Sequence, residues 1–200
     1  MNRAVHPIES ESYRILRSVV DTAHLPARTR DVAERIVHTT ADPSWVDDLV
    51  ADEAALAAGA AALGAGAPLV VDVTMVAAGV TRYPSVCQVS SPAARDLAAQ
   101  TGLTRSAAAV RLAAAAAPDG AVWAVGNAPT ALYELIRLAE AGELRPALVV
   151  GLPVGYVGAA ESKAALRASG LPQLSNVSAR GGSAVAAAAV NALLYGDPLA

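Results

Sequence analysis

Pro68-Leu69-Val70-Val71-Asp72-Val73 is a short apolar run that begins at a turn signal, and from this point the chain changes from helical to strand-like patterns. A run of this length, bounded by a turn residue, is typical of a buried strand. Four similar runs follow, the last of them weaker, at residues 86–89, 121–125, 147–150 and 173–177. The sequence therefore predicts five strands after residue 68.

Helical patterns separate most of these runs and occupy residues 92–100, 104–116, 129–141, 159–168 and 182–194. Unbroken apolar strands that alternate with helices are typical of a parallel sheet covered on both faces. We therefore expect an α/β fold, a three-layer α/β/α sandwich around a five-stranded parallel sheet, doubly wound in the flavodoxin-like manner.

The chain before the first strand is helical in pattern, over residues 9–20, 26–39 and 52–63. Asp42-Pro43 interrupts it, because a residue that precedes proline disfavours the helical conformation. We expect one domain over residues 1–200, with extra N-terminal helices over about residues 1–65 and the parallel α/β part over about residues 66–200.

Composition excludes several classes of protein. The 200 residues are 54% hydrophobic with a net charge of −3, which argues against disorder and against a generic nucleic-acid binder. Cys87 is the one cysteine, so a disulfide framework within the chain is excluded. Residues 1–10 lack the apolar core of a signal peptide, and glycines and a proline interrupt the uncharged residues 54–71. We expect a cytoplasmic protein with neither membrane nor nucleic-acid partners.

Two loops fall where ligands bind in parallel sheets, beyond the carboxyl ends of strands. In residues 126–131, Asn127 is a candidate N-cap, and the free N–H groups there could meet a carboxylate or phosphate, or simply form an ordinary turn. Residues 151–163 are glycine-rich, but their spacing matches neither standard nucleotide motif. Such a loop is equally suited to pass under a flat ligand. Ser162 and Lys163 open the next helix, either facing a pocket or solvated.

Two cation-bearing positions have a functional and a plain interpretation. Thr104 or Gly102 caps the helix that begins at Arg105, a place where a cation opposes the helix dipole. An anionic ligand would explain Arg105, and so would an ordinary surface arginine. His38 lies in the last turn of the predicted helix 26–39, where the dipole should raise its pKa above about 6.5 and make it a competent proton donor. The alternative is a histidine that only complements the dipole.

The three histidines, His6, His24 and His38, are not spaced as a metal set. No Gly-x-Ser-x-Gly motif is present either, so the chain has no readable serine-hydrolase triad.

Taken together, these segments resemble the precorrin-8X methylmutase family, which also includes cobalt-precorrin-8 methylmutases. The resemblance extends from Pro7 to about Leu194. The strings that carry it are residues 8–13, 35–38, 66–68 with Asp72 and Met75, 104–108, 126–132, 153–163 and 181–184. The strings 126–132 and 153–163 are the most specific.

The resemblance implies an isomerase of cobalamin biosynthesis that moves a methyl group from ring carbon 11 to ring carbon 12 of a contracted tetrapyrrole. Precorrin-8X would give hydrogenobyrinate, and cobalt-precorrin-8 would give cobyrinate. His38 aligns with the family's histidine and would protonate a nitrogen of ring C, favouring a 1,5-sigmatropic shift. No cofactor, metal, nucleotide or methyl donor is implied, because the substrate already carries the methyl group. The resemblance also implies a homodimer with pockets near the interface.

A flat, carboxylate-fringed substrate needs an apolar slot with polar groups around its rim. Ser12 aligns with a substrate-contacting serine of the family, Arg105 and Lys163 are candidates for the carboxylates, and Met75 and Tyr156 are candidates for the macrocycle. Arg180 stands alone where the family more often has two arginines. The full set of expected substrate-binding residues is Ser12, Tyr13, Thr39, Asp72, Met75, Thr104, Arg105, Ser106, Asn127, Thr130, Gly155, Tyr156, Val157, Ser162, Lys163 and Arg180.

Two alternatives to the methylmutase remain at this point. The first is a non-catalytic carrier of tetrapyrroles, in which His38 would only donate a hydrogen bond. The second is a flavodoxin-like nucleotide-binding module that uses the loops after Gly126 and Gly151. The lack of a standard phosphate motif counts against the second.

Overall fold

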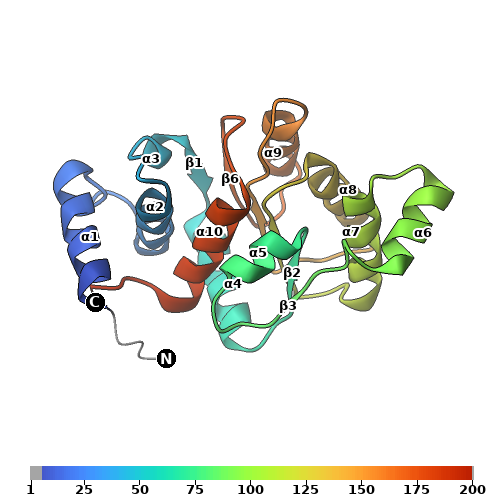
Figure 1. Cartoon of the computed structure of the whole chain (residues 1–200), viewed down its shortest axis with the longest axis horizontal. Helices are drawn as coiled ribbons and strands as arrows, with labels where there is room; N and C mark the ends of the chain where they lie inside the picture. Colours follow the sequence, from blue (N-terminus) through green and yellow to red (C-terminus); the bar gives the residue numbers. More distant parts are fainter. Residues whose placement is uncertain (1–5, 200) are drawn as a thin grey trace.

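The structure is a computed structural model that describes residues 6–199, and a sheet runs through its centre (Figure 1). Within these residues the sheet has six strands in the order β1-β6-β5-β4-β2-β3. Their bounds are β1 (Leu49–Ala51), β2 (Leu69–Val71), β3 (Ser85–Val86), β4 (Val122–Val125), β5 (Leu148–Gly151) and β6 (Gln173–Asn176).

The five strands expected from the apolar runs are present and pair parallel with one another, although β3 is only Ser85–Val86 where residues 86–89 were expected. Their order, β3-β2-β4-β5-β6, is that of doubly wound sheets of the flavodoxin type. The prediction of a five-stranded, wholly parallel sheet is nevertheless wrong, because β1 adds a sixth strand antiparallel to β6. β1 has only three residues and owes its conformation to pairing with β6, so the local pattern did not reveal it.

The helices cover both faces of the sheet. Their bounds are α1 (Pro7–Val19), α2 (Ala27–Thr40), α3 (Trp45–Asp48), α4 (Glu53–Gly64), α5 (Thr74–Gly79), α6 (Pro92–Thr101), α7 (Arg105–Ala116), α8 (Pro129–Glu140), α9 (Ala159–Ala168) and α10 (Ser183–Tyr195). The eight helices expected from periodicity are confirmed to within a few residues. The short helices α3 and α5 were missed, because four and six residues show too little periodicity.

Side chains alternate across the strands and divide the core in two. One side is covered by α4, α5 and α10, with α2 packed on α10, and the other is covered by α7, α8 and α9. The first side receives Leu69, Val71, Val122, Ala124, Leu148 and Val150, and the second receives Val70, Trp123, Val125 and Val149. Helices on both sides explain why these strands lack polar residues on either face.

Helices α1 and α2 form an extra layer beyond α10 (Figure 1). Alanine methyl groups let α10 approach its neighbours closely: a Cβ atom added to Gly79 of α5 would lie 2.7 Å from Cβ of Ala187. Helix α2 packs along the other side of α10. As Figure 1 shows, α1 and α2 occupy one end of the molecule and α6, α7 and α8 the opposite end. Among the described residues, no helix is long and apolar enough to span a membrane.

Candidate functional site

A groove of about 570 Å³ opens between α1, α2 and α10. His38 lies on its wall, as does its neighbour Thr39. The residues that line it are His6, Ile8, Glu9, Arg35, His38, Thr39, Gly79, Thr81, Ala184, Ala187, Ala188 and Asn191. A concave site of this size accommodates at least a large part of a small organic molecule.

The two long walls of the groove differ in chemistry. Helix α10 contributes Ala184, Ala187 and Ala188, whose spacing places three methyl groups on one side of the helix. Helix α2 contributes Arg35 and His38, which lie three residues apart on one helical face. The groove therefore sets an apolar surface against a polar, titratable one.

Two contacts from α1 hold the His38 ring. Ser12 Oγ lies 2.8 Å from Nδ1 of His38, and the Tyr13 ring stacks on the imidazole with centroids 5.0 Å apart and planes at 25°. The Nδ1 atom is therefore engaged within the chain, and Nε2 is the ring nitrogen left for a ligand. Ser12 and His38 also line a smaller pocket of about 210 Å³ between α1 and the C-terminal end of α2.

The electrostatics of His38 differ from the sequence prediction. Burial of the ring lowers its pKa below the usual value, the charge of Arg35 lowers it further, and the charge of Glu9 opposes both. The prediction of a raised pKa is wrong, because desolvation and a guanidinium one turn away outweigh the helix dipole. The lowered pKa favours the neutral imidazole in the free protein.

Arg35 and Glu9 form a pair that the sequence pattern did not predict. Arg35 Nη1 donates to Glu9 Oε1 over 2.8 Å, with each side chain about one-tenth exposed. The Arg35 guanidinium also lies over the Tyr13 ring, 5.4 Å from its centroid. The three-residue spacing of Arg35 and His38 was a usable signal, but Glu9 lies 26 positions from Arg35 and joins it only through tertiary packing.

Asp72 is buried beneath the loop that follows β4. Its carboxylate accepts hydrogen bonds from the backbone N–H groups of Gly126, Asn127 and Ala128, over 2.8–3.0 Å. The N-cap of α8 is Ala128, so the predicted cap at Asn127 is wrong, and the N–H groups expected to be free are taken by Asp72. Burial raises the Asp72 pKa, while the three N–H donors oppose that rise.

Ser162 and Lys163 are buried inside the fold rather than solvated or exposed in a groove. Ser162 Oγ donates to the carbonyl of Ala159. Lys163 Nζ donates to Asn176 Oδ1 over 2.7 Å and to two carbonyl oxygens, those of Ser178 and Arg180, over 2.6 Å each. Burial lowers the Lys163 pKa to about 8.

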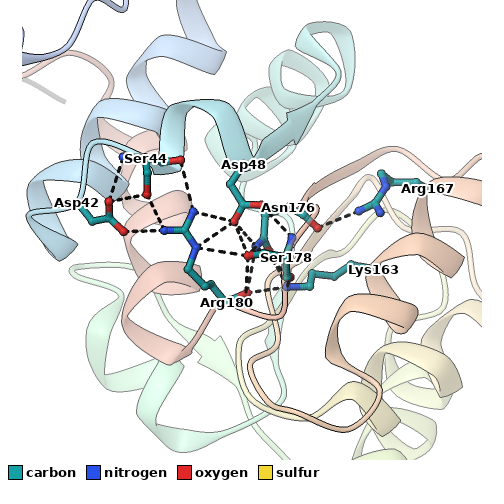
Figure 2. A network of polar contacts seen from close by, with 8 residues as sticks. All are labelled: Asp42, Ser44, Asp48, Lys163, Arg167, Asn176, Ser178 and Arg180. Carbon is teal, nitrogen blue, oxygen red and sulfur yellow. Dashed lines mark hydrogen bonds and ion pairs between the residues drawn. The ribbon is translucent and has the colours of Figure 1, made fainter.

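Arg180 lies in the loop between β6 and α10, and Figure 2 shows its guanidinium among acceptors from the α2–α3 region. It forms ion pairs with Asp42 and Asp48, at 2.6 and 3.0 Å. Its Cζ atom also lies 4.6 Å from the centroid of the Trp45 ring. The arginine expected at a substrate carboxylate thus contacts groups of its own chain.

Thr104 and Thr130 meet at the opposite end of the molecule, where their hydroxyl oxygens are 2.7 Å apart. Thr104 is confirmed as the N-cap of α7, since its side chain accepts from the N–H of Ala107. Both threonines line a second groove of about 420 Å³ beside α8. Arg105, which is exposed, and Ser106 follow directly. Within one chain, this group lies far from α1 and α2 (Figure 1).

Of the expected substrate-binding residues, only Thr39 lines the groove around His38, and the four not yet placed lie outside it. Met75 is 71% exposed on α5, and Tyr156 and Val157 are exposed in the loop between β5 and α9. Gly155 precedes them with a φ of 147°, a conformation that favours glycine. The groove therefore brings together His38 and Thr39, with Ser12 and Tyr13 against the imidazole. Over residues 6–199, no group of three or more His, Cys, Asp or Glu side chains could hold a metal ion.

Comparison with known proteins gives a consistent match. The family model described as precorrin-8X methylmutase matches residues 7–196. The precorrin-8X methylmutase of Pseudomonas aeruginosa is 43% identical over 194 residues, which cover 93% of each chain. The cobalt-precorrin-8 methylmutase of Methanocaldococcus jannaschii is 42% identical over 164 residues, covering 82% of this chain and 77% of that one.

The fold matches as well. The solved structure of precorrin-8X methylmutase from Thermus thermophilus superimposes with a TM-score of 0.86 at 35% identity, covering 93% of each chain. Family model, curated relatives and solved structure agree, so the chain belongs to the precorrin-8X methylmutase family and is a methylmutase of cobalamin biosynthesis, an intramolecular transferase.

Proposed function

We propose that this chain moves the methyl group from ring carbon 11 to ring carbon 12 of precorrin-8X or cobalt-precorrin-8, with His38 as the proton donor. The observation that carries the proposal is the position of His38 on the wall of the 570 Å³ groove, opposite the alanines of α10. Family membership supplies the reaction class, and the groove supplies a histidine at a surface suited to a flat molecule.

The alanine wall suits a macrocycle, because flat apolar surface is stabilised when it leaves water against methyl groups. The opposite wall offers polar groups at the edge of the same slot, Arg35 and Thr39 among them. A ligand with an apolar face and a carboxylate rim would thus find both kinds of partner.

Proton transfer to the substrate would promote the methyl migration by making ring C electron-poor. With Nδ1 engaged by Ser12, His38 would donate from Nε2 to a nitrogen of ring C. The protonated ring withdraws electron density from the neighbouring carbon and favours the 1,5-shift. Because an isomerisation leaves the composition unchanged, the proton must be lost again once the methyl group has moved.

Replacement of His38 by alanine tests the proton-donor role. Turnover of both the metal-free and the cobalt-containing substrate should collapse by about 10²-fold or more, while substrate binding largely survives. His24→Ala is the matched control, since His24 is exposed and does not line the groove. Undiminished turnover in His38→Ala would remove His38 from the mechanism. Assaying the two substrates side by side also identifies which one the wild-type protein prefers.

We further propose that the chain acts as a homodimer with the groove near the interface. The motif residues Thr104, Arg105 and Thr130 lie at the starts of α7 and α8, which are remote from α2 (Figure 1), and a second copy could bring them to its partner's groove. Mixing His38→Ala with Arg105→Ala protein tests this arrangement. Mixed dimers should regain activity that neither variant has alone, whereas a monomer in sedimentation would contradict the proposal.

A further inference from the structure

The two helices that form the long walls of the groove, α2 and α10, run antiparallel. A Cβ atom added to Gly196, just after α10, would lie 3.7 Å from Asp31 Oδ2 and 4.0 Å from Arg28 Nη1, both in the first turns of α2. At the other end of the pair, the residues after α2 meet the residues before α10 through Arg180 and Asp42. His38 lies in the last turn of α2, so it belongs to this second end.

Arg180 makes several contacts across this end. Nη1 donates to Asp42 Oδ2 over 2.6 Å and to Ser44 Oγ over 2.8 Å, and Nη2 donates to Asp48 Oδ2 over 3.0 Å (Figure 2). We call Arg180, Asp42, Ser44 and Asp48 the Arg180 clamp. Asp42 is four residues beyond His38, and Arg180 is two residues before Gly182, the N-cap of α10.

The clamp has a fixed base. The backbone carbonyl of Arg180 accepts from Nζ of the buried Lys163, and it also accepts from Nδ2 of Asn176 (Figure 2). Asp48 in turn accepts from the backbone N–H and the hydroxyl of Ser178. The loop that carries Arg180 is therefore anchored to β6 and α9, and the guanidinium reaches from this anchored loop to the end of α2.

We propose that Arg180 is a positioning residue for His38, because it joins the C-terminal end of α2 to the N-terminal end of α10 and so fixes the width of the groove at the imidazole. This inference rests on the proposed function of His38. It differs from the role expected from the sequence, in which Arg180 binds a substrate carboxylate. A carboxylate contact would act mainly on KM, whereas positioning acts mainly on kcat.

The kinetic experiment compares Arg180→Met, Arg180→Lys and Arg167→Met with the wild type. Loss of the clamp should reduce kcat by on the order of tenfold or more, with KM within about twofold, because a small misplacement of a catalytic group is costly. Lysine retains the charge without the planar fork and should recover part of the loss. Arg167 is the control: it donates to Ser175 Oγ and Asn176 O in the same network without reaching the α2–α3 region.

A second measurement needs no turnover. Burial of the ring and the charges of Arg35 and Glu9 shift the His38 pKa, and Arg180 is not among these causes. A change in the His38 titration on removal of Arg180 therefore reports movement of α2 against the elements packed on it. NMR titration should show altered His38 ring resonances in Arg180→Met and none in Arg167→Met. The signals are assigned with His38→Ala.

Asp42→Asn is a second way to weaken the Arg180 clamp, in case Arg180→Met does not fold. It removes the charge that faces Arg180 but retains Oδ1, which accepts from the N–H and hydroxyl of Ser44. It should shift the His38 signals in the same direction, by less. The proposal is overturned if the soluble variants leave kcat and the His38 titration unchanged, or if KM rises alone. If the wild type has no methylmutase activity but Arg180→Met still shifts the His38 signals, the Arg180 clamp is supported and the proposed function is rejected.

Discussion

Ser12 Oγ lies 2.8 Å from Nδ1 of His38, although 26 positions separate the two residues. The contact joins α1 to α2, and it fixes the plane of the imidazole together with the stacked Tyr13 ring. Whichever atom donates, the hydrogen bond sets the tautomer of a neutral histidine and leaves Nε2 for the ligand.

Ser12→Ala should therefore lower kcat by about tenfold with little change in KM, since the imidazole loses its orientation but keeps its chemistry. Steady-state kinetics together with the ¹⁵N shifts of the His38 ring measure the effect. Ser18→Ala is the control on the same helix, because the Ser18 hydroxyl donates only to the nearby carbonyl of Ile15. An unchanged kcat in Ser12→Ala would show that the hydrogen bond does not serve the reaction.

The lowered pKa of His38 gives a pH prediction. Only the imidazolium form can donate a proton, so kcat/KM should rise as the pH falls through and below about 6.5. A carboxylate-rich substrate would bring negative charge to the ring and raise the His38 pKa in the complex. The fall of kcat with rising pH should therefore lie at higher pH than the fall of kcat/KM, which reports the free enzyme.

The lowered His38 pKa also fixes the direction in which the unfolding free energy changes with pH. A lowered pKa in the folded state means that the unfolded chain binds the His38 proton more tightly. The contribution of His38 to stability is therefore lost as the pH falls below the pKa of the unfolded chain, about 6.5. The plot of unfolding free energy against pH should be flatter in this range for His38→Ala than for the wild type.

The pH dependence of the rate tests the proton-donor role separately. A profile of kcat/KM that is flat from about pH 5 to about pH 8 would contradict protonation by His38.

Local pattern predicted the elements of this fold, and the exceptions have physical causes. The runs around Val70, Trp123 and Val149 became parallel strands because helices cover both faces of the sheet. β1 could not be predicted, since Leu49–Ala51 is a strand only by pairing with β6.

The site was predicted less well. Asp72 and Lys163 stand in specific motifs, and the structure shows them bound to backbone groups and to Asn176. A motif identifies residues that the fold needs as readily as residues that touch a ligand. The pairing of Glu9 with Arg35, and the alanine wall opposite His38, arise from helix packing that a single sequence does not reveal.

Ala184→Leu should block the groove without weakening the fold. Ala184 is exposed on α10 and lines the groove, so a longer side chain projects into the space for the ligand. Leucine is close to alanine in helix propensity, so the unfolding free energy should change by less than about 0.5 kcal/mol. We expect KM to rise at least about tenfold, a loss of about 1.4 kcal/mol of binding. Ala164→Leu, at an exposed position of α9 outside the groove, should leave KM unchanged.

Asp72→Ala should destabilise the protein by about 3 kcal/mol, since three N–H groups of the loop after β4 lose a charged acceptor. Asp52→Ala provides the scale: Asp52 is the exposed N-cap of α4, and its loss should cost about 1 kcal/mol. Urea unfolding measures both. Equal losses in the two variants, or a raised KM with full stability in Asp72→Ala, would mean that Asp72 serves the ligand rather than the loop.

Lys163→Met tests whether the one lysine of the sequence serves the fold or the substrate. Its ammonium group donates to three oxygens in the interior, so methionine should cost about 3 kcal/mol of stability and leave KM nearly unchanged. Because the folded pKa is about 8 and the usual value is 10.5, the unfolded chain binds more protons between these values. Stability should therefore rise from about pH 8 to about pH 10.5 in the wild type, and Lys163→Met should lack that rise.

Amine labelling separates the two roles directly, because Lys163 is the only side-chain amine in the chain. A fully buried ammonium group reacts only when the protein opens, so modification of the native wild type should be as slow as unfolding and should accelerate in urea. A free lysine derivative, labelled in the same sample, reports the intrinsic reactivity of the reagent. Rapid native labelling of Lys163 that substrate suppresses would place its amine at the ligand and remove it from the base of the Arg180 clamp.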